Sequence, residues 1–304
     1  MGGGSRQALA QVCEVEACDG AGLWHAWASA LGGLGAVAGN GNSSTLTYNF
    51  GGAAAGLDYR LYPRLLLGFG AGYAAGIQWV DSFMGRGWSD TVSVTVYGSF
   101  AHQDFYADAL AGYAWSGNQM QRQIMIPGLQ PRTANGSTGA NQFFGQIESG
   151  YRVPVFAAAQ ASVTPFARLQ AATVTQNGFS EWGSAQSLGL NVAAQTTNSL
   201  RTTLGATLAG AIGLAEQRTL DLTLRLGWLH EFADTGRPIT AALAGAPYNG
   251  FTVYGASPQR DSALIGFSAA TLVADAVQLY LRYDGELSTG ASNHALNVGV
   301  RFTW

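Results

Sequence analysis

The sequence predicts an all-β fold, a 12-stranded antiparallel transmembrane β-barrel, and three observations carry this prediction. Only 11% of the 304 residues are charged, whereas a soluble surface typically needs about 25%. The mean hydropathy of +0.09 argues against a helical membrane bundle, because each helix needs about 20 mainly apolar residues in a row. Apolar and polar residues alternate with a period of two, as in a barrel wall that is apolar outside and polar inside.

Composition also limits the functions open to the chain. Its 15 basic and 18 acidic residues give a net charge of −3, whereas a nucleic-acid binder needs a basic stripe that displaces counterions from phosphates. Aromatic residues make up 11% of the chain, which excludes a disordered protein. We therefore expect a folded membrane protein that does not bind nucleic acid.

Strands long enough to cross a bilayer are expected along most of the chain. Alternating segments of about 10 or more residues fit a hydrocarbon core of about 30 Å, whereas strands of soluble proteins average about 5–6 residues. Twelve such segments occur, in order, at residues 22–33, 48–61, 64–78, 88–101, 104–118, 140–153, 161–175, 198–210, 218–232, 262–272, 276–287 and 292–304.

The first of these segments has the least regular alternation. Residues 21–39 contain no Asp, Glu or Arg, so a spanning helix is the alternative for this stretch. Its five glycines and His25 favour a strand, because each glycine costs a helix about 1 kcal/mol relative to alanine.

Later segments separate their apolar and charged residues more cleanly. In 48–61, Leu57, Tyr59 and Leu61 share one face, while Asp58 and Arg60 share the other. Five further segments repeat this separation, and the apolar face carries no charge in any of them. They are 140–153, 198–210, 218–232, 276–287 and 292–304.

The charged face of these strands is expected to bound an enclosed interior. In a soluble sandwich the polar face would instead be outermost, and alternation alone does not distinguish the two; strand length and low charge favour the barrel. Interior charges can pair across the narrow lumen and can hydrogen-bond a threaded chain. The residues expected to line the lumen are Asp58, Arg60, Asp108, Glu148, Arg152, Arg168, Arg201, Asp221, Arg225, Arg282, Asp284, Glu286 and Arg301.

Connections between the segments alternate in length. Short links are expected near residues 62–63, 101–104, 154, 212–216 and 273–275, and long Gly/Asn/Ser-rich loops near 34–47, 79–87, 119–139, 176–197 and 233–261. Short turns at one end, long loops at the other and an even strand count are typical of outer-membrane barrels. This pattern predicts that both barrel termini are periplasmic.

The N-terminal residues are expected to lie outside the barrel wall. Residues 1–5 resemble an expression leader, residues 6–20 form a linker or pore-helix segment, and the barrel domain covers 21–304. A helix over 6–17 would span only about 18 Å. Cys13 and Cys18 can form a disulfide only if that helix breaks between them, because residues five apart on a helix point in different directions.

The sequence carries little catalytic chemistry. It contains neither a His-x-x-x-His nor a Gly-x-Ser-x-Gly motif, and no cofactor or metal site is expected. His230 and Glu231, with Asp234 nearby, form one acid–imidazole cluster, but neighbours on a strand face opposite ways. We therefore predict that the barrel is not an enzyme. A rim-active, omptin-like hydrolase and a passive porin or adhesin barrel remain the alternatives.

The last two segments resemble a known family. Residues 279–286 (LYLRYDGE) and 293–304 (NHALNVGVRFTW) are similar to the β-domain of classical autotransporters, the type V secretion translocators of Gram-negative bacteria. Other stretches add to the resemblance in the same order along the chain: Val96–Phe100, Tyr106–Tyr113, Thr164–Leu169 and Arg260–Gly266.

This resemblance implies a location, partners and a function. It implies a barrel crossed by an α-helix, which anchors an N-terminal passenger segment in the outer membrane and exports it. It also implies contact with outer-membrane lipid and lipopolysaccharide, help from periplasmic chaperones, and insertion by the barrel-assembly machinery. That machinery reads an aromatic C-terminus such as Phe302 and Trp304.

Overall fold

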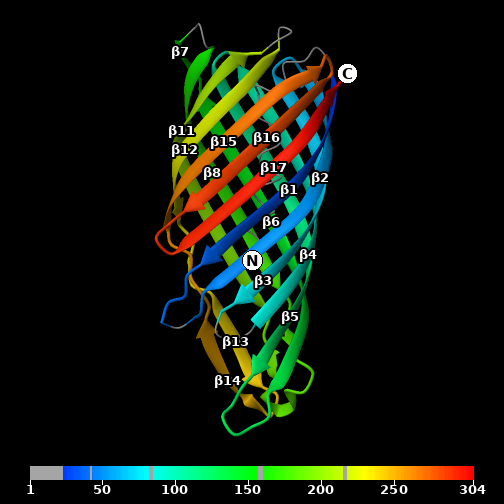
Figure 1. The fold of residues 1–304 in the computed structure, drawn as a ribbon, viewed down its shortest axis with the longest axis vertical. Helices are drawn as coiled ribbons and strands as arrows, with labels where there is room; N and C mark the ends of the chain where they lie inside the picture. The colour runs from blue at the N-terminus through cyan, green and yellow to red at the C-terminus, as the bar shows by residue number, and fades with distance from the viewer. Residues whose placement is uncertain (1–22, 42, 82–84, 157–159, 215–217) are drawn as a thin grey trace.

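The computed structural model of the chain describes residues 23–41, 43–81, 85–156, 160–214 and 218–304. These residues form an all-β molecule dominated by one tall, closed barrel (Figure 1). The twelve barrel strands are β1 (Trp24–Val37), β2 (Leu46–Tyr62), β3 (Leu65–Val80), β4 (Gly85–His102), β5 (Phe105–Ile124), β6 (Arg132–Tyr151), β8 (Ala161–Gln176), β11 (Gln195–Gly213), β12 (Thr219–Glu231), β15 (Asp261–Ala274), β16 (Val277–Leu287) and β17 (Ala291–Thr303).

The barrel closes between the first and last strands. β1 pairs with β17 from His25 opposite Thr303 to Val37 opposite Ala291. Two backbone hydrogen bonds between Trp24 and Trp304, of 3.1 and 3.0 Å, continue this seam to its end. All neighbouring barrel strands are antiparallel. Closure satisfies backbone groups that lipid could not hydrogen-bond.

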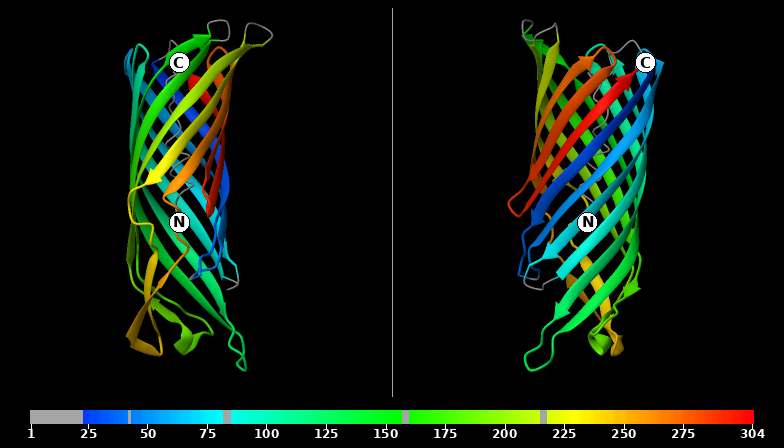
Figure 2. Two further views of the ribbon diagram at one scale, coloured as in Figure 1. Left: turned by 90° about the vertical axis from the view of Figure 1, so that its left-hand side faces the viewer. Right: turned by 45° about the vertical axis from the view of Figure 1, so that its right-hand side comes forward.

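The two ends of the barrel differ (Figures 1 and 2). At the short-turn end, which also holds the C-terminus, two-residue turns join β2 to β3 and β4 to β5, and a four-residue strand, β7 (Val153–Phe156), extends the β6–β8 hairpin. At the long-loop end the β5–β6 hairpin projects, and a second, four-stranded sheet forms. This sheet consists of β9 (Phe179–Ser180), β10 (Leu190–Val192), β13 (Pro238–Leu243) and β14 (Ala246–Tyr254).

Side chains alternate between the two faces of the wall. Val94, Ile147 and Leu226 are 41%, 60% and 47% exposed, whereas their chain neighbours Thr95, Glu148 and Arg225 are buried. Because the wall is a single sheet, the buried set faces the interior. An apolar exterior and a charged interior are expected for a barrel whose surrounding solvent is lipid.

Glycines on the interior face make room for large rings on the neighbouring strand. A Cβ added at Gly68 would lie 2.2 Å from the Tyr97 ring directly opposite, and one at Gly56 would lie 2.6 Å from the Trp27 indole. The rings therefore lie flat against the wall instead of crossing the lumen.

All twelve strands expected from the sequence are present, and the first is β1. The helix considered for 21–39 is wrong over the described residues from Trp24 to Val37, which form a strand. Among the described residues, no helix is long and apolar enough to cross a membrane. The expected helix over residues 6–17, together with Cys13 and Cys18, lies outside the described residues.

Three of the expected long loops contain regular structure instead. Residues 119–139 are mostly strand, since β5 continues to Ile124 and β6 begins at Arg132. The stretch 233–261 contains β13 and β14, and 176–197 contains β9, β10 and a short 3₁₀ helix (Gln186–Leu188). These parts carry no apolar–polar alternation because they project beyond the exposed apolar band, so the pattern that revealed the other strands is missing.

Candidate functional site: the charged barrel interior

The thirteen charged residues expected in the lumen all lie on the strand face that points inward or just beyond its end. Six of them are buried: Asp58, Glu148, Arg168, Arg225, Asp284 and Arg301. Six are partly buried: Arg60, Asp108, Arg152, Arg201, Arg282 and Glu286. Asp221, close to the short-turn end of β12, is exposed. The set therefore lines the interior, with Asp221 at its rim, and nine of its members pair with one another in an interior network.

One buried part of this network centres on Glu148. Its carboxylate Oε2 accepts a hydrogen bond from Arg168 Nε at 2.5 Å and pairs with Arg225 Nη2 at 2.6 Å. Its Oε1 accepts a hydrogen bond from the Tyr106 hydroxyl at 2.8 Å. One carboxylate thus holds two guanidinium groups from two different strands, a buried arrangement that is stable only while all members are present.

An aromatic ring supports the same cluster. The guanidinium carbon of Arg225 lies 3.7 Å from the centroid of the Phe166 ring, which places the cation over the ring face. Such a contact stabilises a partly desolvated cation by about 2 kcal/mol. Phe166 itself occupies space left by Gly205, where an added Cβ would lie 2.7 Å from the ring.

A second cluster lies near the short-turn end. Arg301 Nη2 donates to Asp58 Oδ2 at 3.0 Å, and the Tyr97 hydroxyl donates to the other oxygen of the same carboxylate. The Trp27 indole donates in turn to the Tyr97 oxygen at 2.7 Å. His25, directly opposite Asp58 on β1, is fully buried beside them. This chain of bonds joins four strands: β1, β2, β4 and β17.

A third group lines the β11–β16 side of the interior. Arg201 pairs with Glu286 at 3.1 Å, and Arg282 pairs with Asp284 on its own strand at 3.1 Å. The Arg201–Glu286 pair is less deeply buried than the Glu148 cluster, since its side chains are 16% and 15% exposed, whereas Asp284 is buried. The donors and acceptors of Arg201 and Glu286 are therefore better placed than the buried clusters to meet a polypeptide in the lumen.

Several residues of the network carry no charge and were not expected from the sequence. Trp27, Tyr97, Tyr106 and Phe166 each bind or support a charged partner. An interior glycine across from an aromatic residue, as with Gly68 and Tyr97, is the signal that would have identified one of them, but it can be read only once the strand register is known.

The acid–imidazole cluster expected at the rim is divided between the two faces. His230 Nδ1 contacts Asp261 Oδ1 at 2.8 Å, and its ring lies between those of Trp228 and Phe232 at centroid distances of 5.6 and 4.7 Å. Trp228 is half-exposed on the outer face of β12, so this row belongs to the outer surface.

Glu231 is buried on the opposite, inner face of the strand. Its carboxylate accepts hydrogen bonds from the Ser199 hydroxyl at 2.5 Å and from the backbone N–H of Leu200 at 2.8 Å. Glu231 and His230 therefore do not cooperate. The carboxylate instead binds the start of the loop that follows β12, where it accepts a hydrogen bond from the Ala233 N–H at 3.0 Å.

The two C-terminal aromatic residues face outward. Phe302 and Trp304 are exposed by 44% and 60%, on the same side of the wall as the apolar stripe. Trp24, across the seam from Trp304, is also exposed, and its ring lies tilted against that of Tyr59 at a centroid distance of 4.7 Å. These rings form an aromatic patch at the short-turn end.

Comparison with known proteins agrees with this architecture. The translocator domain of the autotransporter NalP from Neisseria meningitidis superposes with a TM-score of 0.74 at 18% identity, covering 99% of this chain and 94% of that one. The β-domain of the Bordetella autotransporter BrkA gives 0.66 at 16% identity, covering 93% and 100%. At this level of identity the two structures support the fold.

The sequence comparisons carry the family assignment. A Serratia marcescens protein named "Extracellular serine protease" is 27% identical over 282 residues, which are 92% of this chain and 26% of the relative. This chain thus spans about a quarter of that relative's length. A family model described as "Autotransporter beta-domain" matches residues 26–284. Because this match covers most of the barrel, the chain belongs to the autotransporter β-domain family.

Proposed function

We propose that this barrel is the outer-membrane translocator of an autotransporter, which anchors an N-terminal passenger and passes it to the cell surface without a catalytic step of its own. The observation that carries the proposal is a closed barrel of this family whose interior bears a network of charges. Unlike an apolar core, such an interior offers hydrogen-bond partners to an unfolded backbone. No nucleotide is needed if passenger folding outside the cell biases export.

The difference between the two ends of the barrel supports an orientation in the membrane. Short turns face the periplasm and long loops face the outside in outer-membrane barrels. We therefore place the short-turn end, with the first residue of β1 and the C-terminal Trp304, in the periplasm. The second sheet and the projecting β5–β6 hairpin then lie outside the cell, where an exported chain would emerge.

The alternatives receive less support from the geometry. A rim hydrolase needs its His and Asp to face a substrate at the mouth, whereas the His230–Asp261 pair lies among aromatic residues on the outer face. A passive porin does not account for the match to the autotransporter β-domain over residues 26–284.

A fusion experiment tests the proposed function. A secretory signal and a small epitope-tagged reporter are placed before residue 6, and the fusion is expressed in a Gram-negative host. We expect the reporter to be labelled by antibody on intact cells and to be removed by added protease. The matched control carries the same reporter on an unrelated periplasmic protein. A reporter that stays protease-protected while the barrel is folded in the membrane would contradict the proposal.

A second prediction concerns the aromatic C-terminus. We propose that Phe302 and Trp304 are read by the barrel-assembly machinery, since both rings are exposed on the outer face at the short-turn end. Trp304→Ala keeps the backbone bonds to Trp24, because these use main-chain atoms. We therefore expect about tenfold less membrane-inserted barrel in cells, corresponding to about 1.4 kcal/mol in recognition.

Refolding without the machinery supplies the control. Purified Trp304→Ala and wild-type chains should refold to equal yield in detergent micelles, as judged by heat-modifiable gel mobility. Equal loss in cells and in micelles would show that Trp304 acts on stability alone and would contradict a recognition role. Tyr62→Ala, which removes another exposed aromatic side chain at the short-turn end, is the matched variant and should assemble normally.

A further inference from the structure

The loop over residues 177–194, between β8 and β11, packs against the lumen-facing side of the β5–β6 hairpin. Positions 134, 136 and 138 of β6 continue the inward-facing series and are buried, whereas Ser137 between them is exposed. A Cβ added at Gly136 would lie 2.6 Å from the Phe179 ring of the loop. The Thr138 hydroxyl donates to the backbone oxygen of Asn177 at 2.7 Å. The loop therefore lies inside the mouth of the long-loop end.

Backbone hydrogen bonds tie this loop to the free edge of β6. Asn135 and Trp182 exchange two bonds of 2.8 Å, and the Ala185 N–H donates to Thr133 O at 3.1 Å. The Ser184 hydroxyl accepts a bond from the Thr133 N–H at 2.8 Å. Beyond the last β6–β8 pair at the long-loop end, Ala140 opposite Gln176, the loop thus takes the place of a strand next to β6.

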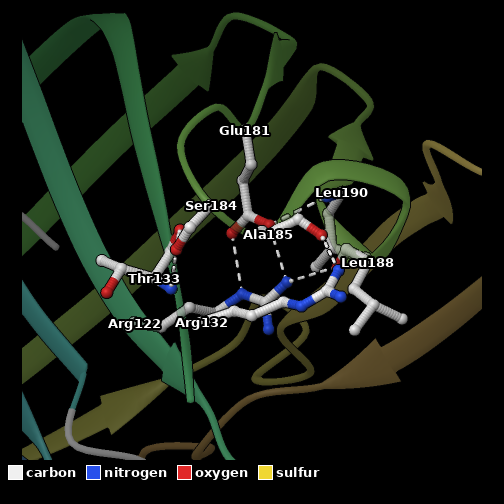
Figure 3. A network of polar contacts seen from close by, with 8 residues as sticks. All are labelled: Arg122, Arg132, Thr133, Glu181, Ser184, Ala185, Leu188 and Leu190. Carbon is white, nitrogen blue, oxygen red and sulfur yellow. Dashed lines mark hydrogen bonds and ion pairs between the residues drawn. The ribbon is translucent and has the colours of Figure 1, made fainter. Parts of the chain in front are cut away.

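The buried carboxylate of Glu181 forms an ion pair between the loop and β5 (Figure 3). Arg122, on the inward face of β5, donates from Nε and Nη2 to the two oxygens of Glu181 at 2.8 and 2.6 Å. This is a bidentate geometry, which is the strongest form of such a pair. The Glu181 side chain is only 6% exposed.

Further bonds connect the same contact to the loop backbone. Glu181 Oε2 also accepts a bond from the Leu190 N–H at 2.8 Å, so the carboxylate closes the loop on itself. Arg122 Nη2 donates to Leu188 O at 3.3 Å, and Arg132 Nη1 donates to Ala185 O at 3.5 Å. Arg122 and Arg132 of the β5–β6 hairpin therefore bind the loop at Glu181, Ala185 and Leu188 (Figure 3).

The far side of the loop is bound to the β13–β14 hairpin. β10 pairs with β13 from Leu190 opposite Leu243 to Val192 opposite Ala241, and Ala244 N–H donates to Gly189 O at 2.8 Å. The loop thus bridges two separate projections of the long-loop end, one following β5 and the other following β12.

We propose that residues 177–194 form a strap that narrows the exit of the barrel, latched by the Arg122–Glu181 ion pair, and that the strap must yield when a polypeptide leaves. This inference rests on the proposed function, since only a transported chain would need the exit. The latch joins two elements that are not neighbours in the barrel, so it can open without breaking any pairing of the twelve-stranded wall.

A disulfide lock tests the need for movement. Thr133→Cys with Ser184→Cys joins the strap to β6, and Thr133→Cys alone is the matched control; Cys13 and Cys18 are changed to Ser in both. In the reporter assay, we expect the double-cysteine variant to place about tenfold less reporter on the cell surface. This is the change expected of a gate whose open population falls from about one-half to a few per cent. Dithiothreitol should restore export. Equal export by a verified crosslinked pair and the single variant would overturn the strap.

Hydrogen exchange tests the latch without relying on export. Glu181→Gln in the purified barrel should speed exchange of the Trp182 and Ala185 amides about tenfold, because they are held by the strap's local stability. Amides in β17 should not change. Asp81→Asn, which removes an exposed carboxylate at the same end, is the control. Unchanged exchange in Glu181→Gln would overturn the latch. If the Thr133→Cys control barrel exports no reporter, the proposed function fails. The exchange measurement on Glu181→Gln still decides whether the ion pair latches the strap.

Discussion

Replacing Glu148 with leucine is expected to destabilise the barrel by about 3–5 kcal/mol, because it leaves buried guanidinium groups without their carboxylate. Arg168 and Arg225 both bind this one side chain, at 2.5 and 2.6 Å. All three residues are less than 10% exposed, so water cannot replace the lost partner. The free energy of unfolding is measured by urea titration in phospholipid vesicles, followed by tryptophan fluorescence.

Asp221→Leu is the matched control for this substitution. Asp221 also lies on the inward face of its strand, but it is exposed near the first residue of β12, at the short-turn end. Its loss should therefore change the free energy of unfolding by no more than about 0.5 kcal/mol. Equal effects of the two variants would show that the Glu148 cluster is no more tightly coupled than a rim charge.

Removing the whole cluster should recover most of the loss. A buried ion network replaced by apolar residues of similar volume is often as stable as the original, or more stable by about 1–4 kcal/mol. A triple variant, Glu148→Leu with Arg168→Met and Arg225→Met, should therefore be more stable than Glu148→Leu alone. If it retains stability but loses export of the reporter, the charges serve the transported chain and not the wall.

The parts of this fold that could be predicted from the sequence are those that contact lipid. A charged residue on the outer face is costly, so the apolar face stays free of charge, and the alternation around Leu224 and Leu226 is preserved. Outside the bilayer that constraint disappears. Gln119, Gln121 and Gln123 lie in a paired strand, yet nothing in their spacing distinguishes them from a polar loop.

Alternation predicts which face a charge occupies, but not which partner it meets. Glu148 and Arg168 are directly opposite on paired strands, and that contact depends on a register that a one-residue shift would destroy. Arg301 and Asp58 lie on β17 and β2, with β1 between them. This pair exists only because the barrel closes, so no local pattern could have shown it. The strap is harder still to predict, because residues 177–194 are held in place by two hairpins distant in sequence, β5–β6 and β13–β14.

Placing an arginine on the outer face is expected to have the second largest effect. Val94 lies on β4 midway between the outward-facing rings of Trp88 and Phe100 and is 41% exposed. If this face contacts hydrocarbon, Val94→Arg should lower the free energy of unfolding in vesicles by about 2–4 kcal/mol, the cost of arginine near the bilayer midplane. The same urea titration measures it.

The position of the substitution along the barrel decides the interpretation. Gln121→Arg places the same charge on an exposed position of β5 at the long-loop end, where the change should stay within about 0.5 kcal/mol. In a water-soluble barrel, both variants would be harmless, because an exposed arginine is well hydrated wherever it lies. A small effect at Val94 would therefore mean that the apolar face does not contact lipid. A large effect at Val94 and a small one at Gln121 would locate the boundary of the membrane between these two rows of the wall.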